Sequence, residues 1–253
     1  MTQTSRAFPY SSFIPYYTNG LGISNDATTP NTKLDVAIGT CVDSTGTFQI
    51  ALTAPVVINA ANTGLNGIDT GTFAASTMYN VFLIADPVTL QPSGCMISAA
   101  AIPLLPFGYS AYALIGHAAT DASIHFLPGY WSAGNGRNRL FMYDAPQATA
   151  ITAGNATTYT AVDLTALVPL VDNLPVWVYS AFTPGAASRT LSMQPVGGTG
   201  AAVTITGQVT SVVVSTNNLM FAKIATAKPE IAYKVANAGD AVAIDVLGYE
   251  FLL

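Results

Sequence analysis

The sequence predicts an all-β protein made of two β-sandwich or jelly-roll-like domains. Only 8% of its 253 residues are charged, and Glu occurs only at Glu230 and Glu250, whereas long surface helices need Glu, Lys, Arg and Gln. The 21 glycines and 15 prolines divide the chain into short segments, as turns do in all-β folds. In the clearest segment Phe48, Ile50 and Leu52 recur at every second position, which is the period of a strand with one buried face.

The first half of the chain contains three predicted strand pairs. Each pair is two apolar segments separated by turn residues. The pairs are Leu34–Val42 with Phe48–Thr53, Tyr79–Ala85 with Gly94–Ala100, and Tyr112–Ala118 with Ser123–Leu127. A turn over Gly134–Gly136 then leads into a strand at Leu140–Tyr143.

A change in composition at Asp144–Gln147 predicts a domain boundary, giving domains over residues 1–144 and 145–253. After it the strand spacing restarts, and eight short strands separated by Gly, Pro and Asn fit a sandwich or jelly roll. These strands are Thr157–Asp163, Pro175–Phe182, Thr190–Pro195, Ala202–Thr206, Ser211–Ser215, Met220–Ile224, Ile231–Val235 and Val242–Phe251.

The scarcity of charge predicts an assembly subunit, because free soluble domains rely on charge to resist association. We therefore expect a homo-oligomer, either a dimer or a trimer, that also contacts other proteins. Apolar residues on both faces of Val81–Ile84 suit a central strand or one that a partner covers, and those of Val242–Phe251 mark a further surface that neighbours could cover. The residues predicted to make subunit contacts are Arg137, Arg139, Tyr249 and Phe251.

Charge and proline placement exclude two classes of partner. A net charge of −5 with eight basic residues gives no footprint for a phosphate backbone, so no nucleic acid is expected. The longest uncharged stretch, Pro87–Thr120, contains four prolines, which break any membrane-spanning helix. The N-terminus lacks the pattern of a signal peptide, so synthesis in a cytoplasm without secretion is expected.

No constellation of residues predicts catalysis, and we expect no metal or cofactor. His117 and His125 flank the third strand pair and could approach each other, but isolated histidines in apolar strands are more often structural. Cys41 and Cys95 lack metal-ligand spacing and are expected to be buried free thiols. The sparse Asp residues lie in or beside turns, which explains them without a hydrolase.

Two aromatic pairs offer a glycan or receptor contact, since sugars stack their apolar ring faces on aromatic side chains. Tyr130 and Trp131 follow a Pro-Gly turn, and Trp177 and Tyr179 share one face of a strand. A core position is the favoured interpretation for Trp177, whereas Trp131 lies in a turn-rich segment and is expected to be more open.

Six segments between residues 15 and 130 form a further pattern. They are Leu21–Asp26, Lys33–Gly39, Asp43–Gly46, Gly67–Gly71, Tyr79–Ile84 and Leu114–Gly116. In this order they resemble a module found in tail-fibre and other structural proteins of tailed bacteriophages. The resemblance implies a non-enzymatic virion component and no catalytic residues. The basic residues that this module usually has near the segment matching Leu114–Gly116 are absent here.

On this resemblance we expect a protein of the virion, made in the bacterial cytoplasm, that serves as a tail-fibre segment or a fibre-associated subunit in assembly and host attachment. Host surface glycan and other virion proteins are then its expected partners. A capsid decoration protein is the alternative, favoured by the absence of a heptad-patterned shaft. A polysaccharide-degrading tail spike is the third hypothesis.

Overall fold

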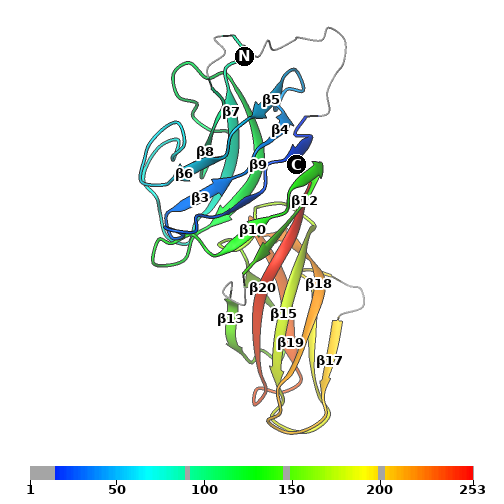
Figure 1. The fold of residues 1–253 in the computed structure, drawn as a ribbon. Helices are drawn as coiled ribbons and strands as arrows, with labels where there is room; N and C mark the ends of the chain where they lie inside the picture. Colours follow the sequence, from blue (N-terminus) through cyan, green and yellow to red (C-terminus); the bar gives the residue numbers. More distant parts are fainter. Residues whose placement is uncertain (1–14, 89–91, 145–148, 199–202, 253) are drawn as a thin grey trace. The chain divides into compact units, whose positions relative to one another are not determined.

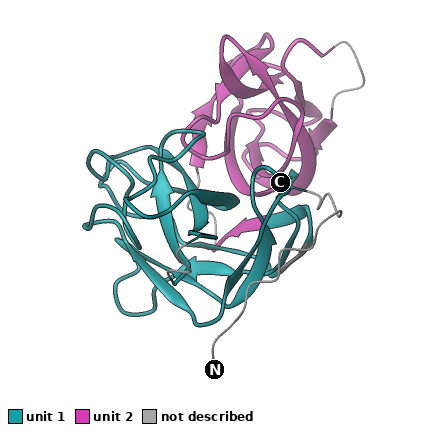
Figure 2. Ribbon diagram, turned by 90° about the horizontal axis from the view of Figure 1, so that it is seen from above, with its two compact units in different colours: residues 1–140, 251–253 teal, residues 141–250 magenta. Residues whose placement is uncertain are grey.

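The computed structural model describes residues 15–88, 92–144, 149–198 and 203–252. These residues form strands joined by turns and contain no helix, so the chain is all-β as predicted. The chain divides into two compact units, coloured in Figure 2: unit 1 comprises residues 1–140 and 251–253, and unit 2 comprises residues 141–250. The predicted boundary at 144/145 thus lies inside unit 2, next to residues 145–148, which fall outside the described ranges.

Unit 1 contains three groups of antiparallel strands (Figure 1). The first has the order β11 (Gly134–Gly136), β1 (Thr18–Gly20), β4 (Gly39–Val42) and β5 (Gln49–Leu52). The second has the order β10 (Gly129–Trp131), β2 (Ile23–Asn25), β3 (Lys33–Val36) and β6 (Val56–Asn59). The third has the order β8 (Gly94–Ser98), β7 (Met78–Ala85) and β9 (Ala111–Ala119).

Strand β7 is central in its sheet, and Val81–Ile84 are all at most 1% exposed. An apolar strand covered on both faces is expected in such a position. Phe82 and Ile84 pack with Met96 of β8, and Leu105 and Tyr109 close over this cluster. Unit 1 itself therefore covers both faces of Val81–Ile84, and this segment is not a surface for neighbouring subunits.

Two of the three predicted strand pairs are confirmed. Val42 pairs with Gln49 in the β4–β5 hairpin, and Ile84 pairs with Gly94 between β7 and β8. The predicted strand Leu34–Val42, however, is broken at Ala37–Ile38 into β3 and β4, which belong to different strand groups. The predicted turn at Gly134–Gly136 is also wrong, because these residues form β11 and pair with β1.

The third predicted pair is wrong because β9 pairs with β7 instead. Residues 123–127 form no strand, and only a single bridge joins Thr120 to Phe126. The Asp121 carboxylate accepts hydrogen bonds from the backbone N–H groups of Ser123 and His125, both at 2.8 Å. This local bonding competes with a strand ladder and closes the segment into a turn.

Asp43 organises the turn between β4 and β5. Its carboxylate accepts backbone N–H bonds from Thr45 at 3.1 Å and from Thr47 and Phe48 at 2.7 Å each. Burial raises the pKa of Asp43, but these bonds and one from the Thr45 hydroxyl outweigh it and hold the pKa below its usual range. The turn predicted from Asp43–Gly46 is confirmed, and the Asp43 carboxylate has a structural role in it.

Unit 2 has two antiparallel sheets. The first has the order β13 (Thr149–Gly154), β20 (Ala241–Leu252), β15 (Leu174–Thr183) and β18 (Val214–Ala225). The second has the order β14 (Thr160–Asp163), β19 (Lys228–Val235), β16 (Arg189–Pro195) and β17 (Val203–Gly207). The β18–β19 hairpin links the two sheets through Thr226 and Ala227, which both adopt positive φ.

The core of unit 2 lies on the inner faces of these sheets. Val176, Val178 and Phe182 alternate along β15 and are fully buried, as are Leu191 and Met193 of β16. Burial of one face on each sheet makes unit 2 a β-sandwich-like unit. Strand β12 (Asn138–Tyr143) contains the division between the units, and β20 ends with Phe251 and Leu252 in unit 1.

The strand predictions for unit 2 differ from the structure in two respects. The predicted strand Ser211–Ser215 is wrong in its first three residues, which form no strand, and its end at Val214–Ser215 joins Met220–Ile224 in one long strand, β18, because Asn217 and Asn218 continue the ladder instead of forming a turn. Strand β13 was not predicted, and its register shifts at Ile151 against β20 explain its weak sequence pattern. The predicted strand at Ala202–Thr206 corresponds to β17, and Ala202 itself lies outside the described residues.

Candidate binding surfaces

Arg139 lies inside unit 1 and is 1% exposed, so the structure corrects its prediction as a subunit contact. Its guanidinium donates hydrogen bonds to the backbone carbonyls of Ile115, of Leu21 at 2.7 Å and of Ser132 at 3.0 Å. Burial lowers the pKa of Arg139 to about 10, so the group remains charged at neutral pH. The sequence carries a signal for this burial, since Arg139 alternates with the buried Phe141 and Tyr143 along β12.

Trp131 is 2% exposed, so a sugar cannot stack on its ring. Its indole N–H donates to the carbonyl of His117 at 2.6 Å, and the Arg139 guanidinium lies 5.5 Å from its ring centroid. Tyr130, which precedes Trp131 in the chain, points to solvent and is 47% exposed. The expected Tyr130–Trp131 glycan contact is therefore reduced to Tyr130 alone.

The two histidines have different surroundings. His117 is buried, and its ring lies 4.4 Å from that of Phe251. Burial, with a further contribution from the charge of Arg139, lowers the pKa of His117 to about 3, so the imidazole is neutral. His125 is half-exposed and lies 3.5 Å from the Asp121 carboxylate. The surroundings of His117 and of His125 are both typical of histidines with a structural role.

Tyr249 and Phe251, predicted as subunit contacts, are 0% and 8% exposed. The Tyr249 ring packs 5.2 Å from that of Phe141, and Phe251 packs on His117. The apolar faces of β20 that the sequence assigned to neighbouring subunits are thus covered within the chain. Arg137 is exposed, so among these four residues it keeps the surface position that a subunit contact requires.

Cys41 and Cys95 are buried free thiols, as expected from their spacing. Burial raises the pKa of both thiols, which makes them poor nucleophiles. Among the described residues no cluster of His, Cys, Asp or Glu could hold a metal ion. Within the same ranges no helix is long and apolar enough to cross a membrane.

An apolar face covers the outer side of β15 and β18 in unit 2. We define it by Pro175, Trp177, Tyr179, Leu219 and Phe221. Register places Trp177 opposite Leu219 and Pro175 opposite Phe221, and neighbours of this kind stack on one side of a sheet. Leu219 is 43% and Phe221 47% exposed, while Trp177 and Tyr179 are half-buried. The expected order of exposure for the two tryptophans is therefore reversed.

A second exposed apolar segment connects β8 and β9 in unit 1. Ile102, Leu104 and Phe107 are 69%, 64% and 102% exposed. The segment is nevertheless anchored, because Leu105 and Tyr109 pack on the β7–β8 cluster and the Leu104 N–H donates to the Asp69 carboxylate at 3.0 Å. We call Ile102, Leu104 and Phe107 the apolar loop. This loop lies in the uncharged stretch Pro87–Thr120, for which no surface role was predicted.

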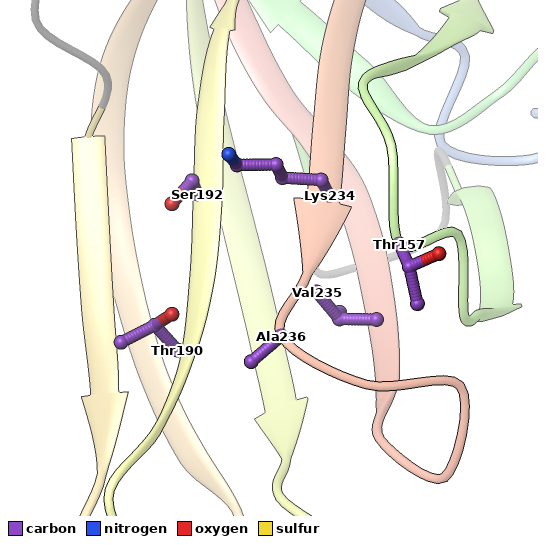
Figure 3. A pocket seen from close by; sticks show the side chains of 6 residues that line it. All are labelled: Thr157, Thr190, Ser192, Lys234, Val235 and Ala236. Atoms are coloured by element: carbon purple, nitrogen blue, oxygen red, sulfur yellow. The ribbon is translucent and has the colours of Figure 1, made fainter.

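The outer face of the other sheet of unit 2 is polar. It has a hollow with a volume of ≈ 180 Å³ (Figure 3). Lys234 of β19 extends across it toward Ser192, its register partner on β16. This site was not predicted, although Lys234 lies between two buried residues of a strand. The lining residues are Thr157, Thr190, Ser192, Lys234, Val235 and Ala236.

These features define an all-β protein of two antiparallel units with one apolar and one hydroxyl-rich outer face on unit 2. No protein-family model matches the sequence, and no curated protein matches it. Among solved structures, a Bacillus thuringiensis Cry1Da tryptic core variant aligns with 10% sequence identity and a TM-score of 0.24, over 96% of this chain and 53% of that chain. The chain thus spans about half the length of that toxin core.

Proposed function

We propose that this chain is a non-enzymatic structural protein of a bacteriophage virion, a tail-fibre segment or fibre-associated subunit that forms homo-oligomers and contributes to host attachment. The observation that carries the assembly part is the apolar face of unit 2 in a chain with only 8% charged residues. Contiguous exposed apolar surface of this kind marks interaction sites in soluble proteins. The resemblance of residues 15–130 to the tail-fibre module supports the virion part.

A second copy of the chain is the partner that fits the apolar face best. From Ser215 to Phe221 on β18, and along the whole of β15, the strands carry no Asp, Glu, Lys or Arg. The charged residues that border this face are Asp245, the partner of Tyr179 on β20, and Lys223, two residues after Phe221 on β18. The contact between two such faces can therefore leave most charged groups in water, whose removal is a main cost of burying a polar surface. A sugar would find few hydrogen-bond partners here besides Asn217, so we assign Trp177 and Tyr179 to subunit contact instead of glycan contact.

The apolar loop offers a second contact, to another virion protein. Phe107 is fully exposed, yet the loop is fixed by its anchor residues, so little conformational entropy is lost on binding. This arrangement suits attachment of unit 1, the part of the chain that resembles the tail-fibre module.

The oligomer is tested by sedimentation of the purified chain and of the double variant Leu219→Lys/Phe221→Lys. We expect the wild type to sediment as an oligomer and the variant as a folded monomer, whose melting temperature does not depend on protein concentration. Thr204→Lys/Thr206→Lys is the matched control, because these side chains are exposed on the other sheet. A wild-type chain that stays monomeric at high concentration contradicts the proposed assembly.

Location is tested by negative-stain microscopy of virions labelled with an antibody to this chain. Label on the tail fibres is the expected result. Label over the whole head overturns the tail-fibre assignment and establishes a capsid decoration protein instead. Degradation of host capsule by the purified chain overturns the non-enzymatic assignment in favour of a tail spike.

A further inference from the structure

The hollow beside Lys234 combines hydroxyl groups and one ammonium, and the aromatic ring of Tyr159 lies against that ammonium. Register pairs Ser192 with Lys234 on one side and Ser192 with Thr204 on the other, and it pairs Thr190 with Thr206. Hydroxyls on neighbouring strands therefore lie side by side on the same outer face. Each hydroxyl can donate one hydrogen bond and accept two, which matches the bonding of a polyhydroxylated ligand.

Lys234 is a cation without a carboxylate partner in this part of the molecule. The salt bridges among the described residues include Arg189 with Asp240 and Lys228 with Asp163, but not Lys234. Glu230 lies on the same outer face of β19 as Lys234, four residues earlier in the strand. At the rise of a β-strand, this spacing corresponds to roughly 13 Å between the two residues. This exceeds the screening length of about 8 Å at physiological salt. An anionic ligand would therefore meet an ammonium that no neighbouring carboxylate neutralises.

Tyr159 positions the ammonium. The Lys234 Nζ atom lies 4.7 Å from the centroid of the Tyr159 ring, within the range of a cation–π contact. Tyr159 is not one of the residues that line the hollow, but it is 38% exposed, so it presents apolar surface beside the ammonium. A sugar ring can pack on such a surface while its hydroxyls bond to Ser and Thr.

We propose that this hollow binds a pyranose sugar that carries a single anionic group, a carboxylate or a phosphate. The volume of ≈ 180 Å³ is below the roughly 300–1,000 Å³ of drug-sized pockets, so it accommodates one ring and not an oligosaccharide. Lys234 binds the anionic group, Thr190 and Ser192 bind hydroxyls, and Tyr159 contacts the ring. The inference deepens the proposed host attachment and rests on it for the biological source of the sugar.

One cation and a few hydroxyl bonds predict weak binding by each site, with a dissociation constant on the order of 1 mM. An oligomer that presents several such sites to a repetitive polysaccharide binds far more tightly than one site does. Weak single-site binding is thus compatible with attachment by the assembled protein.

The test is a titration of the isotope-labelled, full-length chain followed by NMR chemical shifts, with methyl glucuronide, glucose 6-phosphate, methyl glucoside and inorganic phosphate as probes. We expect shifts at the hollow with the first two probes and at least tenfold weaker binding of the neutral glucoside. Lys234→Gln should weaken binding of the glucuronide about tenfold. Lys223→Gln, which removes a partly buried lysine from β18, is the matched control and should leave binding unchanged.

Thr190→Val is a second variant that keeps the side-chain shape and removes a hydroxyl, and it should weaken binding of both anionic sugars without changing the melting temperature. Equal binding of inorganic phosphate and glucose 6-phosphate overturns the sugar site in favour of a simple anion site. Binding that is unaffected by Lys234→Gln, or the absence of shifts at the hollow, also overturns the inference. None of these results alters the sedimentation or labelling outcomes, so failure of the sugar site is distinguishable from failure of the proposed function.

Discussion

Replacement of Arg139 by Met tests whether this buried guanidinium stabilises unit 1. The substitution removes the donors to three backbone carbonyls, those of Ile115, Leu21 and Ser132. Each buried carbonyl left without a donor costs roughly 1–3 kcal/mol, and the lost contact with the Trp131 ring adds about 1 kcal/mol. Removal of a buried charge offsets several kcal/mol of this, because the desolvation cost disappears. We expect a net loss of about 3 kcal/mol in the free energy of unfolding.

The assay is urea unfolding followed by tryptophan fluorescence. The chain has two tryptophans, Trp131 in unit 1 and Trp177 in unit 2. In a Trp177→Phe background the signal therefore reports on unit 1 alone. Arg137→Met is the matched control, because Arg137 is exposed two positions earlier in the chain. A loss of less than about 1 kcal/mol in the Arg139 variant would be the size of a surface substitution and would refute a stabilising role for the buried guanidinium. A loss no larger than that of the Arg137 variant would refute it as well.

Three further predictions concern local structure. Asp43→Asn should lower the free energy of unfolding near pH 6, and the difference from wild type should shrink as the pH falls, because a carboxylate with a depressed folded-state pKa contributes stability that is complete above the unfolded pKa of about 3.9 and is lost as the pH falls through the folded-state pKa; a pH-independent difference in urea unfolding would contradict this. Gly39→Ala should lower the free energy of unfolding by about 2 kcal/mol, since its Cβ would lie 2.4 Å from the Asn19 carbonyl oxygen; a thermal melt within 1 °C of wild type would refute it. Replacing Thr226-Ala227 by Asn-Gly should raise stability by about 1 kcal/mol, because both residues have positive φ; an unchanged or lower melting temperature would contradict that turn type.

Local patterns predicted those parts of the fold that local interactions determine. The β4–β5 hairpin follows from Asp43 and its turn, and β7 follows from a continuous apolar run. The break at Ala37–Ile38 could not be predicted in this way. It depends on β1, whose next residue, Leu21, donates its N–H to the Ile38 carbonyl at 3.1 Å. Pairing partners distant in sequence leave no periodic signal in the strand itself.

The candidate surfaces were predicted less well, because burial depends on which side of a strand other segments cover. Trp131 follows a Pro-Gly turn and Trp177 lies within an apolar strand, yet Trp131 is buried beside Arg139 while Trp177 lies on an outer face. The hollow is assembled from β16, β19 and the segment before β14, which are distant in sequence. No motif within one segment could have indicated it.

The course of β20 has a consequence for how the chain folds during synthesis. This strand is part of unit 2 for most of its length, but its residue Phe251 packs on His117 of unit 1. Contacts between residues so distant in sequence form late and slow folding. As a ribosome releases the chain from its N-terminus, unit 1 emerges first but lacks one of its core residues until unit 2 has been made. The two units are therefore expected to complete their folding together, and an incomplete chain would leave the His117 side of unit 1 uncovered.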